Sequence, residues 1–334
     1  MLATPLPFPK QSPEAYATKL DEPVFDPRLH LALEMPDRAW TLDDIGYSPA
    51  ETSSCASRLA ITAPFRLLSK EGVAAVRRIA IHLRGERRTS TRTAAYLTGG
   101  VYRSRFLRDL CNSPDVAGHL SKIAGCELLP HSMPSQQLYI NYAPDDVGKA
   151  VDTWHTDGIG FDYVVLVSDP ATFVGGEFQF FRGTKDEAAA LLRTKQEDLT
   201  EENANDLPAE RVVSFRMPAA GHAILQQGSF VVHRATRLEQ RAERITLVPG
   251  YVARDAAFPD PTRDVVATWG EPGIVAEYAR HKAWLGRTKL DHMIASIDFD
   301  RDPQAIVGAL RDAIADVEHA MSVISAISER EPAV

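Results

Sequence analysis

The stretch Trp154-His155-Thr156-Asp157-Gly158 is the most informative part of this chain, together with His233 and Arg244-Ile245-Thr246 further along. Side chains in a β-strand alternate between its two faces, so His155 and Asp157 would point to the same side of a strand. Two imidazoles and one carboxylate are sufficient to occupy one face of an octahedral metal ion. We therefore expect His155, Asp157 and His233 to be the ligands of one metal.

Each part of this pattern has an ordinary alternative. The chain contains 10 histidines, and an HxD triplet arises by chance in many such chains. His155 and Asp157 alone could be a pair at a strand end, and His233 alone could be a buried structural histidine. The chain order, the strand-like surroundings and the arginine that follows favour the metal site. Among the other histidines, His222 precedes an apolar strand and is the best competing candidate; we interpret it as structural.

Composition narrows the class of protein. The 334 residues are 44% hydrophobic and 25% charged, with a formal net charge of -8, which is typical of a soluble globular protein. A negative charge argues against nucleic acid or an anionic membrane as a partner. The three cysteines, Cys55, Cys111 and Cys126, are isolated and suggest neither disulfides nor a cysteine metal site. Without a membrane-length apolar run, we expect a cytoplasmic protein and no membrane contact.

The periodicity predicts one domain over residues 1–334 with four parts. Residues 1–64 are proline-rich and are expected to form an N-terminal arm. Residues 65–135 have helical spacing and are expected to support the core. Residues 136–253 are expected to form the β-core, with a polar insertion at 183–210 that could be a helix or a lid. Residues 254–334 return to helical spacing, over 274–292 and 303–327.

The β-core is expected to contain about eight short strands separated by turn signals. Such a run predicts an α+β protein with a mainly β core, a double-stranded β-helix (jelly roll) of the cupin type, with flanking N- and C-terminal helices. The expected strands are 136–142, 152–156, 163–167, 177–181, 211–215, 223–226, 230–233 and 245–251.

These residues resemble the signature of the Fe(II)/2-oxoglutarate-dependent dioxygenase superfamily. That signature is HxD, a long gap, a second His, and about ten residues later an Arg followed two residues on by Ser or Thr. Three further pieces are similar to family strands: the first barrel strand, a glycine pair that opens a middle strand, and a tight turn before the second histidine. They are Gln137–Pro144, Gly175-Gly176-Glu177 and Gly221–Gly228. The resemblance covers about a third of the chain, and the long interval between His155 and His233 departs from it.

The resemblance implies a set of cofactors and roles. Fe(II), 2-oxoglutarate and O2 would be used, with ascorbate as a reductant in vitro. Arg244 would pair with the distal carboxylate of 2-oxoglutarate through a planar fork, and Thr246 would add a hydroxyl bond. Tyr142, at the end of the first barrel strand, would also contact 2-oxoglutarate. If Tyr142 faced inward, Tyr139 and Asn141 would face outward, and the sequence leaves this choice open.

By the same resemblance, the protein would oxidise an unactivated C–H bond of a small molecule, and release succinate and CO2. Hydroxylation is the default outcome, and desaturation or ring closure are variants of it. An amino acid or specialised metabolite is the expected substrate, by elimination of nucleic acid. Two alternatives remain open: a metal-dependent cupin enzyme that does not use 2-oxoglutarate, and a non-catalytic barrel that binds a partner. The oligomeric state is not predicted.

Overall fold

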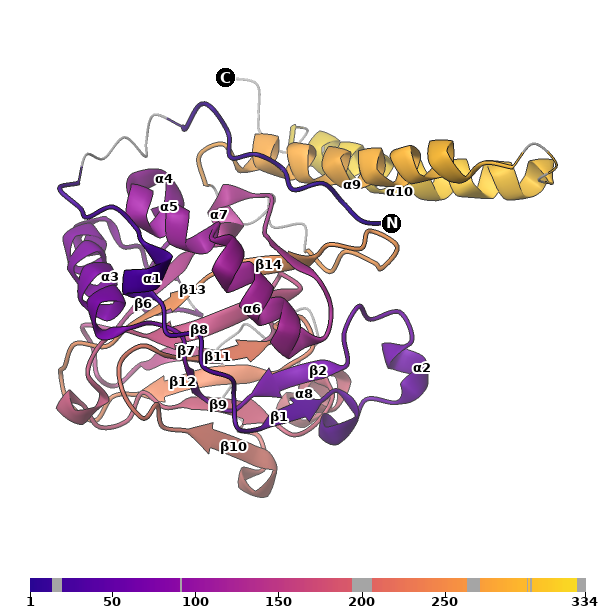
Figure 1. Ribbon diagram of the computed structural model, residues 1–334. Helices are drawn as coiled ribbons and strands as arrows, with labels where there is room; N and C mark the ends of the chain where they lie inside the picture. The colour runs from indigo at the N-terminus through magenta and orange to yellow at the C-terminus, as the bar shows by residue number, and fades with distance from the viewer. Residues whose placement is uncertain are drawn as a thin grey trace.

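Two antiparallel sheets stacked face to face form the centre of the protein, with helices against one of them (Figure 1). The computed structural model describes residues 1–13, 20–90, 92–193, 206–262, 271–298, 300 and 302–328. This arrangement is the expected α+β class with a jelly-roll core. Within the described residues, no helix is both long and apolar enough to cross a membrane.

The larger sheet has a seven-strand path and three further strands attached to it. The path runs β1 (Ala39–Thr41), β2 (Leu59–Thr62), β11 (His222–Gln226), β8 (Phe161–Leu166), β13 (Ile245–Val248), β6 (Tyr139–Tyr142) and β4 (Tyr96–Leu97); β3 (Phe65–Arg66), β14 (Gly250–Ala253) and β5 (Leu128–Pro130) lie off it. The smaller sheet has the order β10 (Val212–Phe215), β9 (Phe178–Phe181), β12 (His233–Arg237) and β7 (Ala150–His155).

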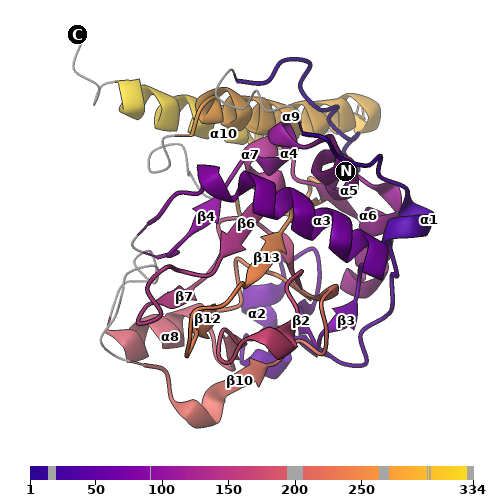
Figure 2. The ribbon, with the colours of Figure 1, turned by 90° about the vertical axis from the view of Figure 1, so that its left-hand side faces the viewer.

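Helices cover the outer face of the larger sheet (Figure 2). They are α3 (Lys70–Leu83), α5 (Arg105–Cys111) and α6 (Pro114–Ala124), and their apolar faces share one core with the outward side chains of β6, β8 and β13. α6 begins with Pro114 directly after Ser113, as the sequence predicts. Within the expected support region 65–135, these helices are accompanied by the short strands β3, β4 and β5.

The shorter helices and turns connect these layers. They are α1 (Pro27–His30), α2 (Pro49–Thr52), α4 (Gly100–Arg103) and α7 (Pro134–Gln137), with 3₁₀ turns η2 (Asp43–Ile45), η3 (Arg84–Glu86), η4 (Pro170–Thr172) and η6 (Ala209–Arg211). In the expected N-terminal arm, Ala3 donates its N–H to Arg254 O at 2.8 Å. The arm region also contains β1 and β2, which the sequence prediction missed.

All eight expected strands differ from the observed ones at one end or both, and three of them differ most. The segment 136–142 begins with a helical turn, because Pro134 starts α7. The segment 245–251 is two strands, β13 and β14, interrupted at Pro249, which has no N–H to donate. The segment 230–233 was expected to end at His233, but β12 begins there. Phe230 and Val231 instead lie in a turn in which both N–H groups bond to Gln227 O at 3.0 Å.

The insertion at 183–210 begins with α8 (Lys185–Leu192), which packs on the outer face of the smaller sheet. Ala188 and Leu192 are buried there against Trp154 and Phe181. Trp154 precedes the inward-facing His155 and points to the opposite side of β7. The expectation of a lid was therefore wrong for α8, which buries small apolar side chains away from the space between the sheets. Residues 194–205 of the insertion lie outside the described part of the chain.

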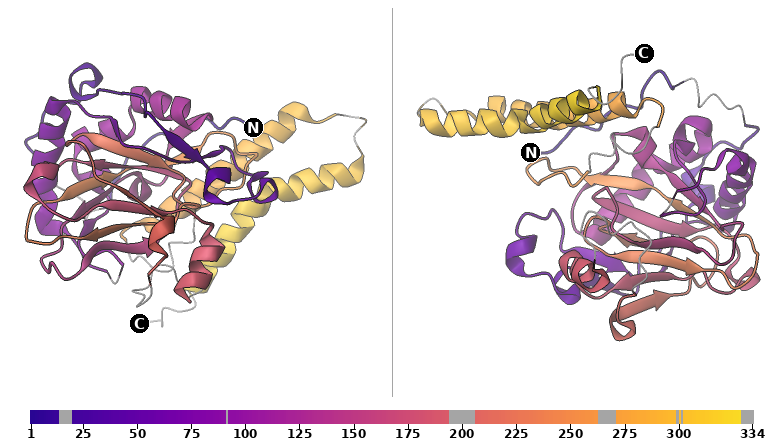
Figure 3. Two further views of the ribbon diagram at one scale, coloured as in Figure 1. Left: turned by 90° about the horizontal axis from the view of Figure 1, so that it is seen from below. Right: turned by 180° about the vertical axis from the view of Figure 1, so that it is seen from behind.

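The C-terminal helices α9 (Ile274–Ser296) and α10 (Pro303–Ser328) pair with each other and extend past the sheets (Figures 1 and 3). A buried polar network joins α9 to the body. His281 Nε2 and Lys282 Nζ each lie 2.8 Å from Asp260 Oδ2, and Ser132 Oγ lies 2.6 Å from His281 Nδ1. Burial alone would raise the pKa of Asp260, but the charges of His281 and Lys282 hold it well below its usual value. The network therefore anchors the helical pair.

Replacing Asp260 by Asn should loosen this anchor. Removing one charge from a buried ion pair costs about 3–5 kcal/mol, so we expect a clear fall in the free energy of unfolding, measured in urea. Because the pKa of Asp260 is depressed on folding, its contribution is present above a pH of about 4 and is lost as the pH falls. Asp291→Asn, in an exposed pair with Arg287, is the control and should cost less than about 0.5 kcal/mol. Equal stability of the two variants would contradict the anchor.

Candidate metal centre

His155, Asp157 and His233 converge between the two sheets, where one ligand atom from each lies within 4.8 Å of the others. His155 ends β7 and His233 begins β12, and the two residues are direct partners in the antiparallel ladder. Their ring centroids are 4.1 Å apart. Asp157 lies two residues beyond the end of β7, and its N–H donates to Gly228 O at 2.8 Å. The sequence thus selected three residues that the fold brings together.

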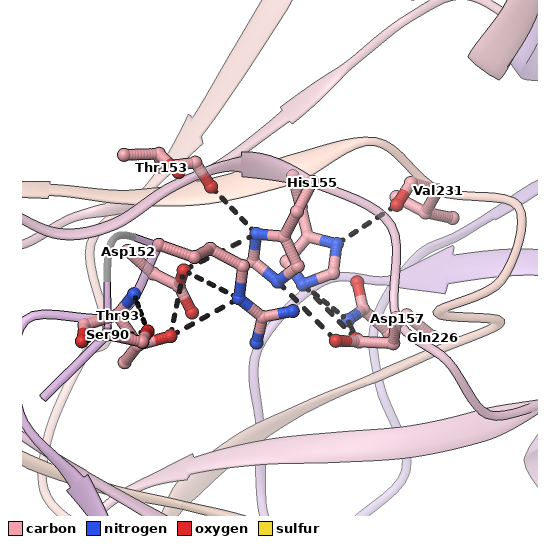
Figure 4. Close-up of polar contacts among 10 residues, drawn as sticks. Ser90, Thr93, Asp152, Thr153, His155, Asp157, Gln226 and Val231 are labelled. Atoms are coloured by element: carbon pink, nitrogen blue, oxygen red, sulfur yellow. Dashed lines mark hydrogen bonds and ion pairs between the residues drawn. The ribbon is translucent and has the colours of Figure 1, made fainter. Parts of the chain in front are cut away.

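Both imidazoles are held in one tautomer by the backbone. His155 Nδ1 lies 2.7 Å from Thr153 O, and this contact is drawn in Figure 4. His233 Nδ1 lies 2.9 Å from Val231 O. A carbonyl accepts only from a protonated nitrogen, so each Nδ1 carries the hydrogen and each Nε2 has its lone pair free. This is the arrangement in which histidines bind metals.

The distances suit an octahedral ion. His155 Nε2 lies 3.4 Å from Asp157 Oδ1, and His233 Nε2 lies 3.3 Å from Asp157 Oδ2. Two ligands at right angles, each about 2.1 Å from a metal, would be about 3.0 Å apart. Nitrogen and oxygen donors without a thiolate favour Fe(II), and Mn, Co and Zn would also bind. The three residues therefore fit a metal that keeps the opposite face open.

The electrostatics of the cluster keep these ligands in the forms that bind metal. Burial, followed by the neighbouring charge of His155, lowers the pKa of His233 to about 4, so that this imidazole is neutral near pH 7. Burial alone would raise the pKa of Asp157, but His233 and His155 hold it below its usual value. A neutral imidazole and an ionised carboxylate are the forms that donate electrons to a metal.

A β-bulge in β7 decides which side chains reach the cluster. His233 and Ala235 are two residues apart on β12, whereas their partners on β7, His155 and Asp152, are three residues apart. The extra residue on β7 turns both Asp152 and His155 inward, and both line the same pocket. Strict alternation would place them on opposite faces. The sequence prediction assumed regular alternation through Asp157, which the structure replaces with a bulge and a loop.

Gln226 and Asp162 support the cluster from the larger sheet, and the sequence analysis did not single them out. Gln226 Nε2 lies 3.2 Å from Asp157 Oδ2, 3.0 Å from Asp162 Oδ1 and 3.1 Å from His233 Nε2. Burial and the charge of Asp157 raise the pKa of Asp162 well above its usual value. Gln226 thus positions Asp157 beside a neutral carboxyl. In the sequence, Gln226 at the end of the predicted strand 223–226 and Gly228 just after it were the residues that could have indicated this support.

The pocket above the cluster contains a buried cation, Arg244, that has no anionic partner within hydrogen-bond distance among the described residues. Arg244 is 4% exposed, and its Nε donates to Gly176 O at 2.8 Å. Within the described residues, its Nη1 is buried and has no hydrogen-bond partner. Burial lowers the pKa of Arg244 to about 10, partly offset by Asp152. A buried guanidinium that still has an N–H group to donate is suited to bind a carboxylate.

Gly176 explains why Arg244 can take this position. Its φ is +68°, and an added Cβ would lie 2.7 Å from Arg244 Cδ and 2.8 Å from Nε. Any larger residue would therefore push Arg244 out of the pocket. Thr246 follows on the same face of β13, is 2% exposed and lines the pocket beside Arg244. The structure thus brings together Arg244 and Thr246 as the sequence predicts.

Tyr142 is the exception among the predicted site residues. It belongs to the core under the helices, and its hydroxyl donates to Ala80 O at 2.8 Å on α3. On β6 the inward residues are instead Tyr139 and Asn141, which line the pocket. The expectation that Tyr142 contacts 2-oxoglutarate is corrected, because the strand presents its other face to the metal cluster. A single strand in isolation cannot show which face meets which layer.

Comparison with known proteins finds likeness only among solved structures. No protein-family model matches the chain, and no curated protein sequence matches it. The epimerase SnoN from nogalamycin biosynthesis, described as non-heme and alpha-ketoglutarate-dependent, is 17% identical over 67% of this chain and 93% of its own, with a TM-score of 0.44. EvdO2 from Micromonospora carbonacea var. aurantiaca, also crystallised with 2-oxoglutarate, is 13% identical over 66% and 95%, with a TM-score of 0.38.

A prolyl 4-hydroxylase structure from Phytophthora capsici is 12% identical over 88% of this chain and 92% of its own, with a TM-score of 0.37. These identities and TM-scores are low. The metal centre therefore rests on the His155, Asp157 and His233 geometry and on the buried Arg244 of this chain.

Gly228→Ala should disturb the metal centre although it replaces none of the three candidate metal ligands. A Cβ at Gly228 would lie 2.6 Å from Asp157 Oδ2 and would also meet Asp162, so Asp157 must move. We expect the affinity for Co(II) or Fe(II), measured by calorimetry under argon, to fall about 10-fold or more. Gly118→Ala is the control, because a Cβ there has no atom within 4 Å among the described residues. Unchanged metal affinity in Gly228→Ala would mean that Asp157 is not a ligand.

Proposed function

We propose that this protein is an Fe(II)- and 2-oxoglutarate-dependent oxygenase that acts on a small molecule. The observation that carries the proposal is one pocket that holds both a His-Asp-His cluster with fixed imidazole tautomers and a buried arginine that has no ion-pair partner in the described part of the chain. The cluster fits Fe(II), and the arginine fits the distal carboxylate of 2-oxoglutarate. When bound, the iron would supply O2 chemistry: 2-oxoglutarate is oxidised to succinate and CO2, and a substrate C–H bond is oxidised.

The residues of the chain would contribute binding, orientation and exclusion of water. His155, Asp157 and His233 would hold one face of the iron. Arg244 would orient 2-oxoglutarate through a bidentate pair. Thr246 would donate its hydroxyl to the same carboxylate. The pocket lies between two sheets and has apolar walls, which would protect the reaction from solvent. Hydroxylation is the proposed outcome.

The two alternatives lack a comparable observation. A cupin enzyme that does not use 2-oxoglutarate has no need for a buried cation beside its metal, and leaving a charge unpaired there costs stability. A non-catalytic barrel would have no need for two histidines with both Nδ1 atoms bonded to carbonyls and both Nε2 atoms turned to one carboxylate. The geometry therefore favours the oxygenase, and succinate formation from 2-oxoglutarate is the direct assay.

Asp157→Ala should abolish Fe(II) binding and all turnover while the fold is retained. Asp157 is the only carboxylate of the cluster as the described residues define it, and two imidazoles alone leave the metal without its anionic ligand. Iron stoichiometry, succinate formation and the circular dichroism spectrum are the measurements. His233→Ala should behave in the same way, whereas His292→Ala, an exposed histidine on α9, should not. Normal iron content and activity in both cluster variants would disprove the site.

Arg244→Lys should raise the Michaelis constant for 2-oxoglutarate strongly. Lysine keeps the charge but replaces the planar fork by a single ammonium group. Loss of a buried charge-assisted pair costs about 2–5 kcal/mol, which corresponds to roughly 30-fold to several thousand-fold in affinity. Fe(II) binding should be retained, so a metal titration separates this effect from unfolding. Arg287→Lys, on the exposed face of α9, is the matched control. An unchanged constant would favour the enzyme without 2-oxoglutarate.

A further inference from the structure

A second group of hydrogen-bond donors lies in the same pocket, away from Arg244. Along β13, Arg244, Thr246 and Val248 all line the pocket. Tyr139 pairs with Val248, which is four residues from Arg244. At about 3.3 Å per residue, this part of the pocket is roughly 13 Å from Arg244 along the strand.

Arg92 is the charged residue of this group. Its Nε lies 3.3 Å from Asp152 Oδ1, and the same oxygen lies 3.6 Å from His155 Nδ1. Arg92 is therefore next to the first metal ligand. The backbone around it is tied to β7, since Ala94 N donates to Val151 O at 3.3 Å and Thr93 Oγ1 lies 3.3 Å from Asp152 Oδ1. These contacts hold the guanidinium at one wall of the pocket.

The outer end of the Arg92 guanidinium remains available. Arg92 Nε donates a hydrogen bond to Thr93 Oγ1 at 3.2 Å. The two Nη atoms of Arg92 make no hydrogen bond with the described residues. Arg234, which also lines the pocket, is different. It bonds to Gln179 and Asp206 and lies over the Trp154 ring at 4.4 Å. Arg92 is thus the pocket arginine that can accept a new partner at this end.

The buried side-chain amide of Gln136 is a second feature of the pocket that indicates a bound ligand. Gln136 is 1% exposed and lines the pocket. Its amide lies near the Tyr139 hydroxyl, yet its Nε2 makes no hydrogen bond of normal geometry with the described residues. A buried amide donor without a partner costs about 1–3 kcal/mol. A fold retains such a cost where a ligand supplies the missing acceptor. Arg92 Nη and Gln136 Nε2 are all donors, so the matching group is rich in acceptors.

We propose that Arg92 and Gln136 bind a carboxylate of the substrate, which is therefore a small organic acid or a free amino acid. The proposal rests on the proposed function, in which Arg244 and the metal hold 2-oxoglutarate. The flat guanidinium end matches the two oxygens of a carboxylate better than it matches a neutral amide. Ile159 and Val248 provide apolar wall in the same pocket, which suits a short carbon chain between the carboxylate and the oxidised C–H bond.

The test measures binding of acids against their own amides. The protein is kept anaerobic with Fe(II) and saturating 2-oxoglutarate, and a panel of free amino acids and small carboxylic acids is screened by melting-temperature shift. Each acid that binds is then compared by calorimetry with its primary amide. We expect at least one acid to bind about 10-fold or more tightly than its amide, the least that loss of a charge-assisted pair predicts.

Three variants assign that preference to residues. Arg92→Gln should remove the difference between acid and amide, and Gln136→Leu should weaken binding of the acid several-fold. Arg92→Lys keeps a charge opposite Asp152, so it protects the fold, and should retain only part of the preference. Arg287→Gln, on the exposed face of α9, should retain all of it.

Several outcomes would overturn the proposal: no acid binds, acid and amide bind equally to the wild type, or Arg92→Gln retains the preference. Competition between the acid and 2-oxoglutarate would assign Arg92 to the co-substrate instead, and also overturns it. Binding of 2-oxoglutarate to the wild type is measured in the same samples. If 2-oxoglutarate fails to bind, the proposed function fails and this inference with it. If it binds and the acid preference is absent, only the substrate site is wrong.

Discussion

The antiparallel pairing of β12 with β7 sets His233 opposite His155, and the candidate site depends on this register. A shift of β12 by one residue would turn His233 to the outer face, against α8, and would separate it from His155. The bulge in β7 then adds Asp152 to the inner face, and the loop beyond β7 adds Asp157. Two backbone carbonyls at Thr153 and Val231 complete the arrangement by fixing both imidazole tautomers.

Some buried polar atoms in and beside the pocket have no hydrogen-bond partner among the described residues. Arg244 Nη1 and Gln136 Nε2 are buried without a partner among the described residues, and Asp162 Oδ2 is a third such atom. Folding normally eliminates such groups because each one loses its hydration. Two of the three line the space above the metal cluster and are donors. Under the two proposals, each of these donors would bind an acceptor of a bound molecule.

Small residues make these positions possible. Gly228 allows Asp157 and Asp162 to approach the backbone after β11, and Gly176 allows Arg244 to cross the start of β9. The helices on the outer face of the larger sheet contribute differently, because they bury the opposite side of its strands and so fix which face looks inward.

The amino-acid sequence was sufficient to predict the class of the fold and the clustering of His155, Asp157 and His233, because strand alternation, helical spacing and the chemistry of His and Asp are local properties. The roles expected of Arg244 and Thr246 came from the resemblance to a known family. Three-dimensional packing was needed to show that Tyr139 and Asn141, rather than Tyr142, face the pocket, and that α8 covers the outer face of the smaller sheet. It also decided the roles of Gln226, Asp162, Arg92 and Gln136. Strand direction and layer packing are long-range properties, since the face a residue presents depends on which distant segment buries the other face.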